Sequence, residues 1–226
     1  MRVHVAFTPE EDASAPLGIV VDVLRATSTI AQALAAGYRR VLCCTDIEEA
    51  RQLRGETQDS LVGGERGAVR IEGFDVGASP REFLEPRADT LILSTTNGTS
   101  TILAAAERCD EVLLGSLLNL SAVAAEVRGR GVDTAVFCAG FKGSFALDDA
   151  YCAGRIVDLV EAKRSDAALA AELIAGSFPG AHEALLARTY GPPGLEEDIL
   201  FCSRESVLPV VPRFAGMVGP AAQVVA

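Results

Sequence analysis

The chain has 226 residues, 49% of them hydrophobic and 23% charged, which is enough to form one large α/β domain with a sizeable core. Its 31 acidic and 20 basic residues give a formal net charge of −11, which repels nucleic-acid backbones and anionic membrane surfaces. The composition therefore argues against nucleic-acid or membrane partners. An anionic ligand would need arginines, helix N-termini or a divalent cation to reverse this field locally.

Short β-branched segments alternate along the chain with segments of helical periodicity, which predicts βαβ units and a largely parallel sheet. Several of the strand segments are continuous apolar runs, as expected for strands covered on both faces. Helices are indicated around residues 120–127 and 156–160, where apolar residues recur at helical spacing. The predicted strands cover residues 18–24, 39–44, 60–64, 90–94, 111–115 and 133–138.

The last part of the chain is marked by the Gly-Pro-Pro-Gly sequence at 191–194, which predicts a surface turn before an element at 195–204. Residues 207–211, with Pro209 inside and Pro212 after them, predict an edge strand or an extended tail. No linker, low-complexity tract or repeat divides the chain. We therefore expect a single domain over residues 1–226, with a C-terminal wrap over about 195–226.

Targeting and redox signals are weak. The N-terminus has no apolar leader and no 18-residue apolar run occurs, so we expect a cytoplasmic protein. The six cysteines form no CxxC pair, which predicts buried, reduced thiols. The chain has two histidines, which argues against a histidine-based zinc site or a Ser/His/Asp triad, and the P-loop and Cys-x5-Arg phosphate-binding motifs are missing.

Polar residues follow two of the predicted strands, where ligands bind in open α/β sheets. Asp22 ends an apolar run and Arg25 opens the next helix. A carboxylate there is costly unless it is hydrogen-bonded or lies beside a metal; otherwise Asp22 only caps the helix. The sequence Thr-Thr-Asn-Gly-Thr at 95–99 could arrange backbone N–H groups around an oxyanion at a helix N-terminus, or form a plain cap.

Three further segments are candidates for the site. Asn119 ends a Gly-Ser-Leu-Leu-Asn sequence, where helix capping is the favoured role, and the two acids at 148–149 suit the first turn of a helix. The glycine-rich segments 63–67 and 73–80 predict an irregular loop folded over a site, or else a solvated surface loop. Carboxylates in a histidine-poor chain favour Mg²⁺ over Zn²⁺.

Seven ordered motifs, covering about residues 18–212, together resemble the 2-phosphosulfolactate phosphatase family. The resemblance implies a three-layer α/β/α fold and a Mg²⁺-dependent acid phosphatase that releases phosphate from 2-phosphosulfolactate to give sulfolactate, a step of coenzyme M biosynthesis. The motifs are VVDVLRATSTI, GERG, GFDVGASP, STTNGT, GSLLN, CAGFKGSFALDD and EEDILFC.

Matching those motifs residue by residue gives the expected site. We expect Asp22, Arg25 and Glu65 to be catalytic, and Mg²⁺ to be held by Asp22, Glu65, Asp75 and Asp149. The expected substrate-binding residues are Arg66, Thr96, Asn97, Gly98, Thr99, Asn119 and Lys142. Arg66 and Lys142 are the candidates for the carboxylate and sulfonate of the substrate. Whether Asp22 attacks phosphorus or a carboxylate activates water stays open.

The chain departs from the family pattern at three places. It has Ala78 where relatives usually have Asn, Asp148 where they usually have Glu, and a shorter segment over residues 164–195. The first two put a polar role at those positions in doubt. Two alternatives remain: a phosphatase for another small phosphorylated acid, and an anion-binding regulatory protein without turnover. A homodimer is possible on base rates alone.

Overall fold

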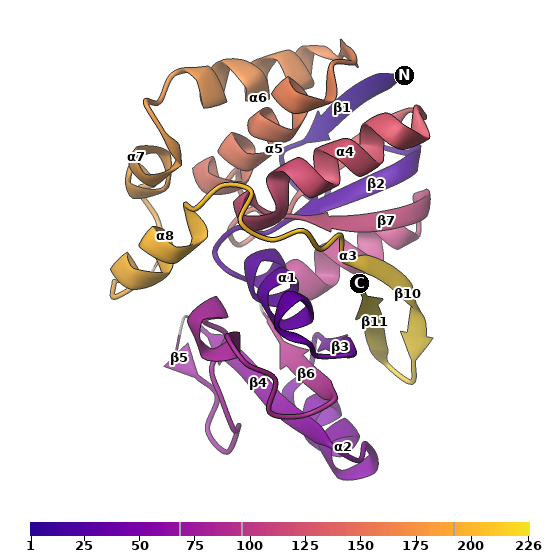
Figure 1. Ribbon diagram of the computed structural model, residues 1–226, viewed down its shortest axis with the longest axis vertical. Helices are drawn as coiled ribbons and strands as arrows, with labels where there is room; N and C mark the ends of the chain where they lie inside the picture. The colour runs from indigo at the N-terminus through magenta and orange to yellow at the C-terminus, as the bar shows by residue number, and fades with distance from the viewer. Residues whose placement is uncertain (68, 96, 192) are drawn as a thin grey trace.

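The computed structural model describes residues 1–67, 69–95, 97–191 and 193–226 (Figure 1). Strands and helices alternate through most of the chain, and two short 3₁₀ helices are labelled η1 and η2. In chain order the elements are β1 (Arg2–Ala6), β2 (Ala15–Val21), α1 (Ala26–Ala36), β3 (Arg40–Cys44), α2 (Ile47–Glu56), β4 (Ser60–Arg66), β5 (Val69–Arg70), η1 (Pro80–Phe83), β6 (Thr90–Ser94), α3 (Gly98–Ala106), β7 (Cys109–Gly115), η2 (Leu117–Asn119), α4 (Leu120–Arg130), β8 (Thr134–Cys138), α5 (Leu147–Val160), β9 (Lys163–Arg164), α6 (Asp166–Gly176), α7 (Ala181–Leu186), α8 (Glu196–Cys202), β10 (Arg213–Val218) and β11 (Ala221–Val225).

The strands of the described residues form one sheet in the order β5-β4-β6-β3-β11-β10-β7-β2-β8-β1-β9. It contains two groups of parallel strands, β4-β6-β3 and β7-β2-β8-β1, and the antiparallel hairpin β10–β11 lies between them. Figure 1 shows the carboxyl ends of both groups converging beside α1 and α8. The predicted α/β fold with a largely parallel sheet is confirmed.

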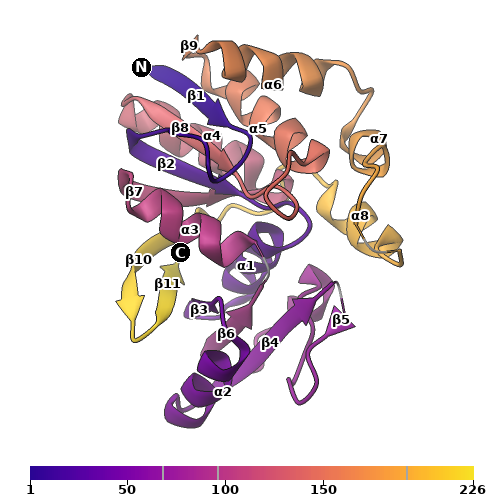
Figure 2. The ribbon, with the colours of Figure 1, turned by 180° about the vertical axis from the view of Figure 1, so that it is seen from behind.

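Helices cover both faces of the sheet, which gives the three-layer α/β/α arrangement (Figures 1 and 2). Ile19 and Val136 pack with α4 and α5 on one face of the β7-β2-β8-β1 group, whereas Val20 and Phe137 pack toward α3 on the other. This alternation follows from the two-residue period of a strand. Both kinds of position are apolar because both faces are covered. α2 packs on β4 and β6, and α6 packs on α5 and β1.

One predicted loop is a strand. We expected an irregular loop over residues 63–67, but β4 continues through Gly63, Gly64 and Glu65 to Arg66. Gly64 is required by close packing, because a Cβ at this position would lie 2.6 Å from the Ser94 carbonyl oxygen. The glycines therefore mark a close approach between neighbouring backbones rather than a break in the strand.

The C-terminal segment differs most from expectation. Residues 207–212 form no strand; of our two alternatives, the extended connection is the one observed, and the Leu208 N–H donates to the Leu118 carbonyl at 2.8 Å. The strands come later, as β10 and β11, and they lie in the middle of the sheet rather than at its edge. β10 is partly exposed or exposed along its whole length, so it lacks the continuous buried run of a central strand, whereas β11 is largely buried.

The structure also bears on the cysteines and on membrane-spanning helices. All six cysteines are free, and five of them are buried. Burial raises the pKa of the Cys138 thiol well above its ordinary value, with nearby Asp149 adding to the effect, so this residue suits packing rather than nucleophilic attack. In the described ranges, no helix combines the length and apolarity that crossing a membrane requires.

Candidate active site

A cavity of about 410 Å³ lies where the carboxyl ends of the two parallel groups meet; we call it the central cavity. A small recess of about 30 Å³, the inner recess, shares four of its wall residues and adds Asp22 and Thr95. Strands far apart in the sheet contribute to both walls. The central cavity is lined by Leu24, Arg25, Glu65, Gly67, Asn97, Phe141, Lys142, Asp148, Arg188, Tyr190, Gly191 and Leu195.

Asp22 follows β2 directly and is 8% exposed. Its Oδ1 accepts a hydrogen bond of 3.2 Å from the Ala26 N–H at the start of α1, and its backbone is fixed by Thr27. Burial raises the pKa of Asp22 to about 7, with the charges of Asp148 and Glu65 adding to the rise, while the Ala26 hydrogen bond and Arg25 oppose it. The site thus holds a carboxyl group whose charged form is costly without a nearby cation.

The start of α3 packs directly against Asp22. A Cβ at Gly98 would lie 2.4 Å from the Ala26 Cβ and 2.8 Å from Asp22 Oδ2, so only glycine fits there without displacing a neighbour. The N-termini of α1 and α3 therefore come together at the inner recess, where their backbone N–H groups favour negative charge. Asn97 lines both cavities, whereas Thr96 lies outside the described residues.

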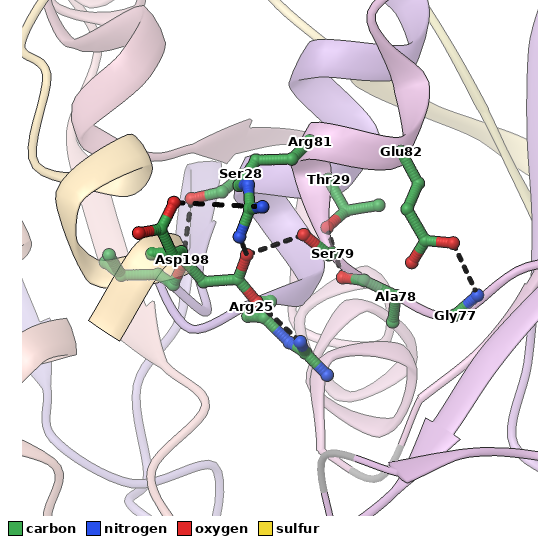
Figure 3. A network of polar contacts seen from close by, with 11 residues as sticks. Arg25, Ser28, Thr29, Gly77, Ala78, Ser79, Arg81, Glu82 and Asp198 are labelled. Carbon is green, nitrogen blue, oxygen red and sulfur yellow. Dashed lines mark hydrogen bonds and ion pairs between the residues drawn. The ribbon is translucent and has the colours of Figure 1, made fainter. Parts of the chain in front are cut away.

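Arg25 is held by an acid from the far end of the chain. Its Nη1 donates to Asp198 Oδ2 at 2.6 Å, and both side chains are under 10% exposed. Asp198 also accepts from Ser79 Oγ at 2.5 Å and lies 3.7 Å from Arg81 Nη1 (Figure 3). A buried ion pair with further hydrogen bonds fixes the guanidinium at the wall that the two cavities share. The peptide bond between Leu24 and Arg25 is cis.

The two acids that open α5 have different roles in the structure. Asp149 accepts from the Val23 N–H at 2.9 Å and from the Gly140 N–H at 3.0 Å, so it ties the loops after β2 and β8 together. Asp148 lines the central cavity and accepts a hydrogen bond from the Tyr190 hydroxyl. Burial raises the pKa of both carboxyl groups.

The expected site residues divide into two sets. Asp22, Arg25, Glu65, Asn97 and Lys142 line the central cavity or the inner recess, and Gly98 packs against Asp22. The other expected residues that the structure describes contact backbone or neighbouring side chains instead.

Among these, Asp75 Oδ2 accepts from the Val62 N–H at 2.9 Å and lies 3.5 Å from Arg54 on α2. Arg66 donates to the carbonyls of Glu65 and Thr45 and to Ser94 Oγ.

Asn119 is fully buried: it accepts from the Ser116 N–H and hydroxyl and donates to the carbonyls of Leu114 and Val210. This is not the cap of α4 that we favoured, because the Asn119 side chain makes no hydrogen bond to the start of that helix. It closes the capping box of η2 instead and reaches the C-terminal segment. Thr99 Oγ1 lies 3.2 Å from Thr95 Oγ1 and is buried behind the recess.

Several wall residues escaped the sequence analysis. Arg188 and Tyr190 lie after α7, away from any junction between a strand and a helix, so no local pattern pointed to them. Asp148 is not among the expected site residues, because its departure from the expected family pattern put a polar role there in doubt. Asp198 belongs to the EEDILFC motif, which could have suggested a role for its third acid.

The carboxylates at the inner recess fit a divalent cation that takes only one or two protein ligands. Across residues 1–67, 69–95, 97–191 and 193–226, no group of three His, Cys, Asp or Glu side chains is placed to hold a metal. Asp22 and Glu65 nevertheless line the same recess, and the negative charge of Glu65 disfavours the charged form of Asp22. Mg²⁺ commonly takes one or two carboxylates and completes its shell with water and phosphate oxygens. The oxygen donors present fit that kind of site.

The fold and cavity together define an α/β/α protein with a mixed-charge cavity beside the N-termini of α1 and α3. The family model described as 2-phosphosulpholactate phosphatase matches residues 4–216. Proteins named probable 2-phosphosulfolactate phosphatase are similar to this chain in Carboxydothermus hydrogenoformans (35% identity, 94% of this chain and 93% of the relative), Symbiobacterium thermophilum (37%, 93% and 96%) and Thermus thermophilus (36%, 98% and 98%). The chain belongs to the 2-phosphosulfolactate phosphatase family.

Proposed function

We propose that this chain is a Mg²⁺-dependent phosphatase that hydrolyses 2-phosphosulfolactate to sulfolactate and inorganic phosphate at the inner recess. The observation that carries the proposal is the side-by-side placement of Arg25, fixed by Asp198, and the buried carboxyl of Asp22 between two helix N-termini. The names of the relatives supply the substrate. The same proposal places this reaction in coenzyme M biosynthesis, in the cytoplasm.

Charge neutralisation is the main task in this reaction. A phosphate monoester carries two negative charges, and its transition state spreads charge over the three equatorial oxygens. Arg25 supplies a guanidinium at the recess wall, and the first N–H groups of α1 and α3 add positive partial charge. When bound by Asp22 and Glu65, Mg²⁺ would add positive charge at the same oxygens.

Asp22 either attacks phosphorus as the nucleophile or accepts a proton from the water that attacks. Its pKa of about 7 means that a nearby positive charge is needed to keep it fully ionised at neutral pH. Rapid acid quenching with ³²P-labelled substrate separates the two routes. A hydroxylamine-sensitive label on the protein indicates attack by Asp22, and unlabelled protein throughout turnover indicates attack by water.

The function is tested by phosphate release from 2-phosphosulfolactate and from a panel of other phosphorylated acids. We expect 2-phosphosulfolactate to be preferred, activity to vanish in EDTA and return with Mg²⁺, and Asp22→Asn to lose turnover by orders of magnitude. Preference for another phospho-acid would replace the substrate assignment. Saturable binding without phosphate release would identify an anion-binding protein instead.

A further inference from the structure

Two cations stand on the outer wall of the central cavity, beyond the inner recess. Lys142 comes from the loop after β8 and Arg188 from the segment after α7. Over the residues that the structure describes, neither has an acidic side chain within ion-pair distance, in contrast to other arginines of the chain. In a chain with a net charge of −11, unpaired cations facing a cavity create a local site for anions.

The position of Arg188 is fixed by the backbone that follows it. Its Nη1 donates to the Tyr190 carbonyl at 2.9 Å. Gly191 has a φ of +97°, and a Cβ at this residue would lie 2.3 Å from Arg188 Nη1. The glycine therefore leaves the space that the guanidinium occupies. An arginine held in this way loses less side-chain entropy when it binds an oxyanion than a mobile one does.

Aromatic rings lie between the two cations. Phe141 and Tyr190 stack with their ring centroids 5.0 Å apart, and Lys142 Nζ lies 5.4 Å from the centroid of the Phe141 ring. The Asp148 carboxyl on this wall accepts a hydrogen bond from the Tyr190 hydroxyl and is attracted by the charge of Arg188, which opposes the rise of its pKa. The outer wall thus offers an apolar face for a carbon chain, with positive charge beside it.

We propose that Arg188, with Lys142 beside it, binds a second anionic group of the substrate, at the end of its carbon chain away from the phosphate. The cavity would then select phosphate esters of small acids with an anionic substituent at that end, such as a sulfonate. The inference rests on the proposed function, because it places the phosphate beside Arg25 at the inner recess. It assigns selectivity to the segment that follows α7.

A purely structural role for Arg188 makes a different prediction. If the guanidinium only ordered the turn at 188–191, its loss would weaken all substrates alike. A binding role instead acts on the substrate that carries the second anion. The matched pair that separates these roles is 2-phosphosulfolactate and 2-phospholactate, which share the phosphate and the carboxylate and differ in the sulfonate.

The experiment compares kcat/KM for the two esters in the full-length protein. We expect Arg188→Gln to lower the ratio of 2-phosphosulfolactate to 2-phospholactate by about 10- to 100-fold, the effect of removing a charge-assisted hydrogen bond. Arg188→Lys should lower it less, because it keeps the charge and loses the planar fork. The control is Arg128→Gln on α4, whose guanidinium also donates to a backbone carbonyl, that of Leu159, outside the cavity wall. It should leave the ratio unchanged.

The outcomes separate this inference from the proposed function. If the wild type hydrolyses either ester and Arg188→Gln leaves the ratio within about twofold, the second-anion site is overturned while the phosphatase stands. If the wild type releases phosphate from neither ester, the proposed function fails, and calorimetric titration with sulfolactate and lactate decides the site. Tighter binding of sulfolactate that Arg188→Gln abolishes supports it; equal binding of both acids overturns it.

Discussion

The buried carboxyl of Asp22 should cost the folded chain stability at neutral pH, and Asp22→Asn should remove that cost. The pKa is about 7 in the folded chain against 3.8 for an ordinary aspartate. Between these values the folded chain holds a proton that the unfolded chain has released, so stability falls as pH rises through this range. Below it, both states are protonated and the cost disappears.

The magnitude follows from about 1.4 kcal/mol for each pH unit between the two pKa values. The cost is about 2 kcal/mol at pH 5 and about 4 kcal/mol at pH 8, where the folded carboxyl is also ionised. Asparagine keeps the oxygen that accepts from the Ala26 N–H. The gain in unfolding free energy from Asp22→Asn should therefore widen by about 2–3 kcal/mol between pH 5 and pH 8.

Urea unfolding of wild type and variant at both pH values, in EDTA, measures this gap. Asp46→Asn is the control, since that carboxylate also accepts from helix N–H groups but lies in solvent. If the gain in unfolding free energy from Asp22→Asn is the same or smaller at pH 8 than at pH 5, the reasoning is refuted. Saturating Mg²⁺ at pH 8 should stabilise the wild type and have less effect on Asp22→Asn, if Asp22 holds the ion.

Three further predictions follow from the packing around the site. Asp198→Asn should lower kcat/KM for phosphate release about 10- to 100-fold, because Arg25 loses its buried counter-charge, whereas Asp89→Asn at an exposed pair should have no effect. Gly98→Ala should lower the unfolding free energy by about 1–3 kcal/mol through contact with Ala26, and an unchanged melting temperature would contradict this. Truncation before β10 should abolish cooperative unfolding, as monitored by near-UV circular dichroism, because β10 and β11 join the two parallel groups.

The fold was readable from the sequence where burial is complete. β2, β3, β6 and β8 are apolar on both faces, so their residues show a signal that does not depend on their neighbours. The hairpin of β10 and β11 does depend on neighbouring strands for its place in the sheet. β10 is partly exposed along its length, and only its pairing with β7 places it inside the sheet. Tertiary pairing of this kind leaves little trace in a local pattern.

The candidate site was readable to a lesser degree. A polar residue after a strand can face a cavity, as Asp22 does, or satisfy buried backbone groups, as Asn119 does. The two cases look alike in sequence, because both need a buried side chain that forms hydrogen bonds. Arg188 could not be predicted from a local pattern, because it lies far from any strand end. It reaches the cavity only through the path of the chain after α7.

The hairpin that the sequence did not reveal explains why one cavity can draw on both parallel groups. β11 is antiparallel to β3, β10 to β11, and β10 to β7, so the two groups run in opposite directions across the hairpin. In a flat sheet their carboxyl ends would lie on opposite edges. Among the described residues, β10 pairs with β7 only where Arg213 lies opposite Leu113, and the Leu114 N–H donates to the Pro212 carbonyl beside it. Because this pairing is so short, one group of parallel strands can be rotated relative to the other. Figure 1 shows the result: both sets of carboxyl ends point to the same region, which brings Arg25 and Glu65 to one wall.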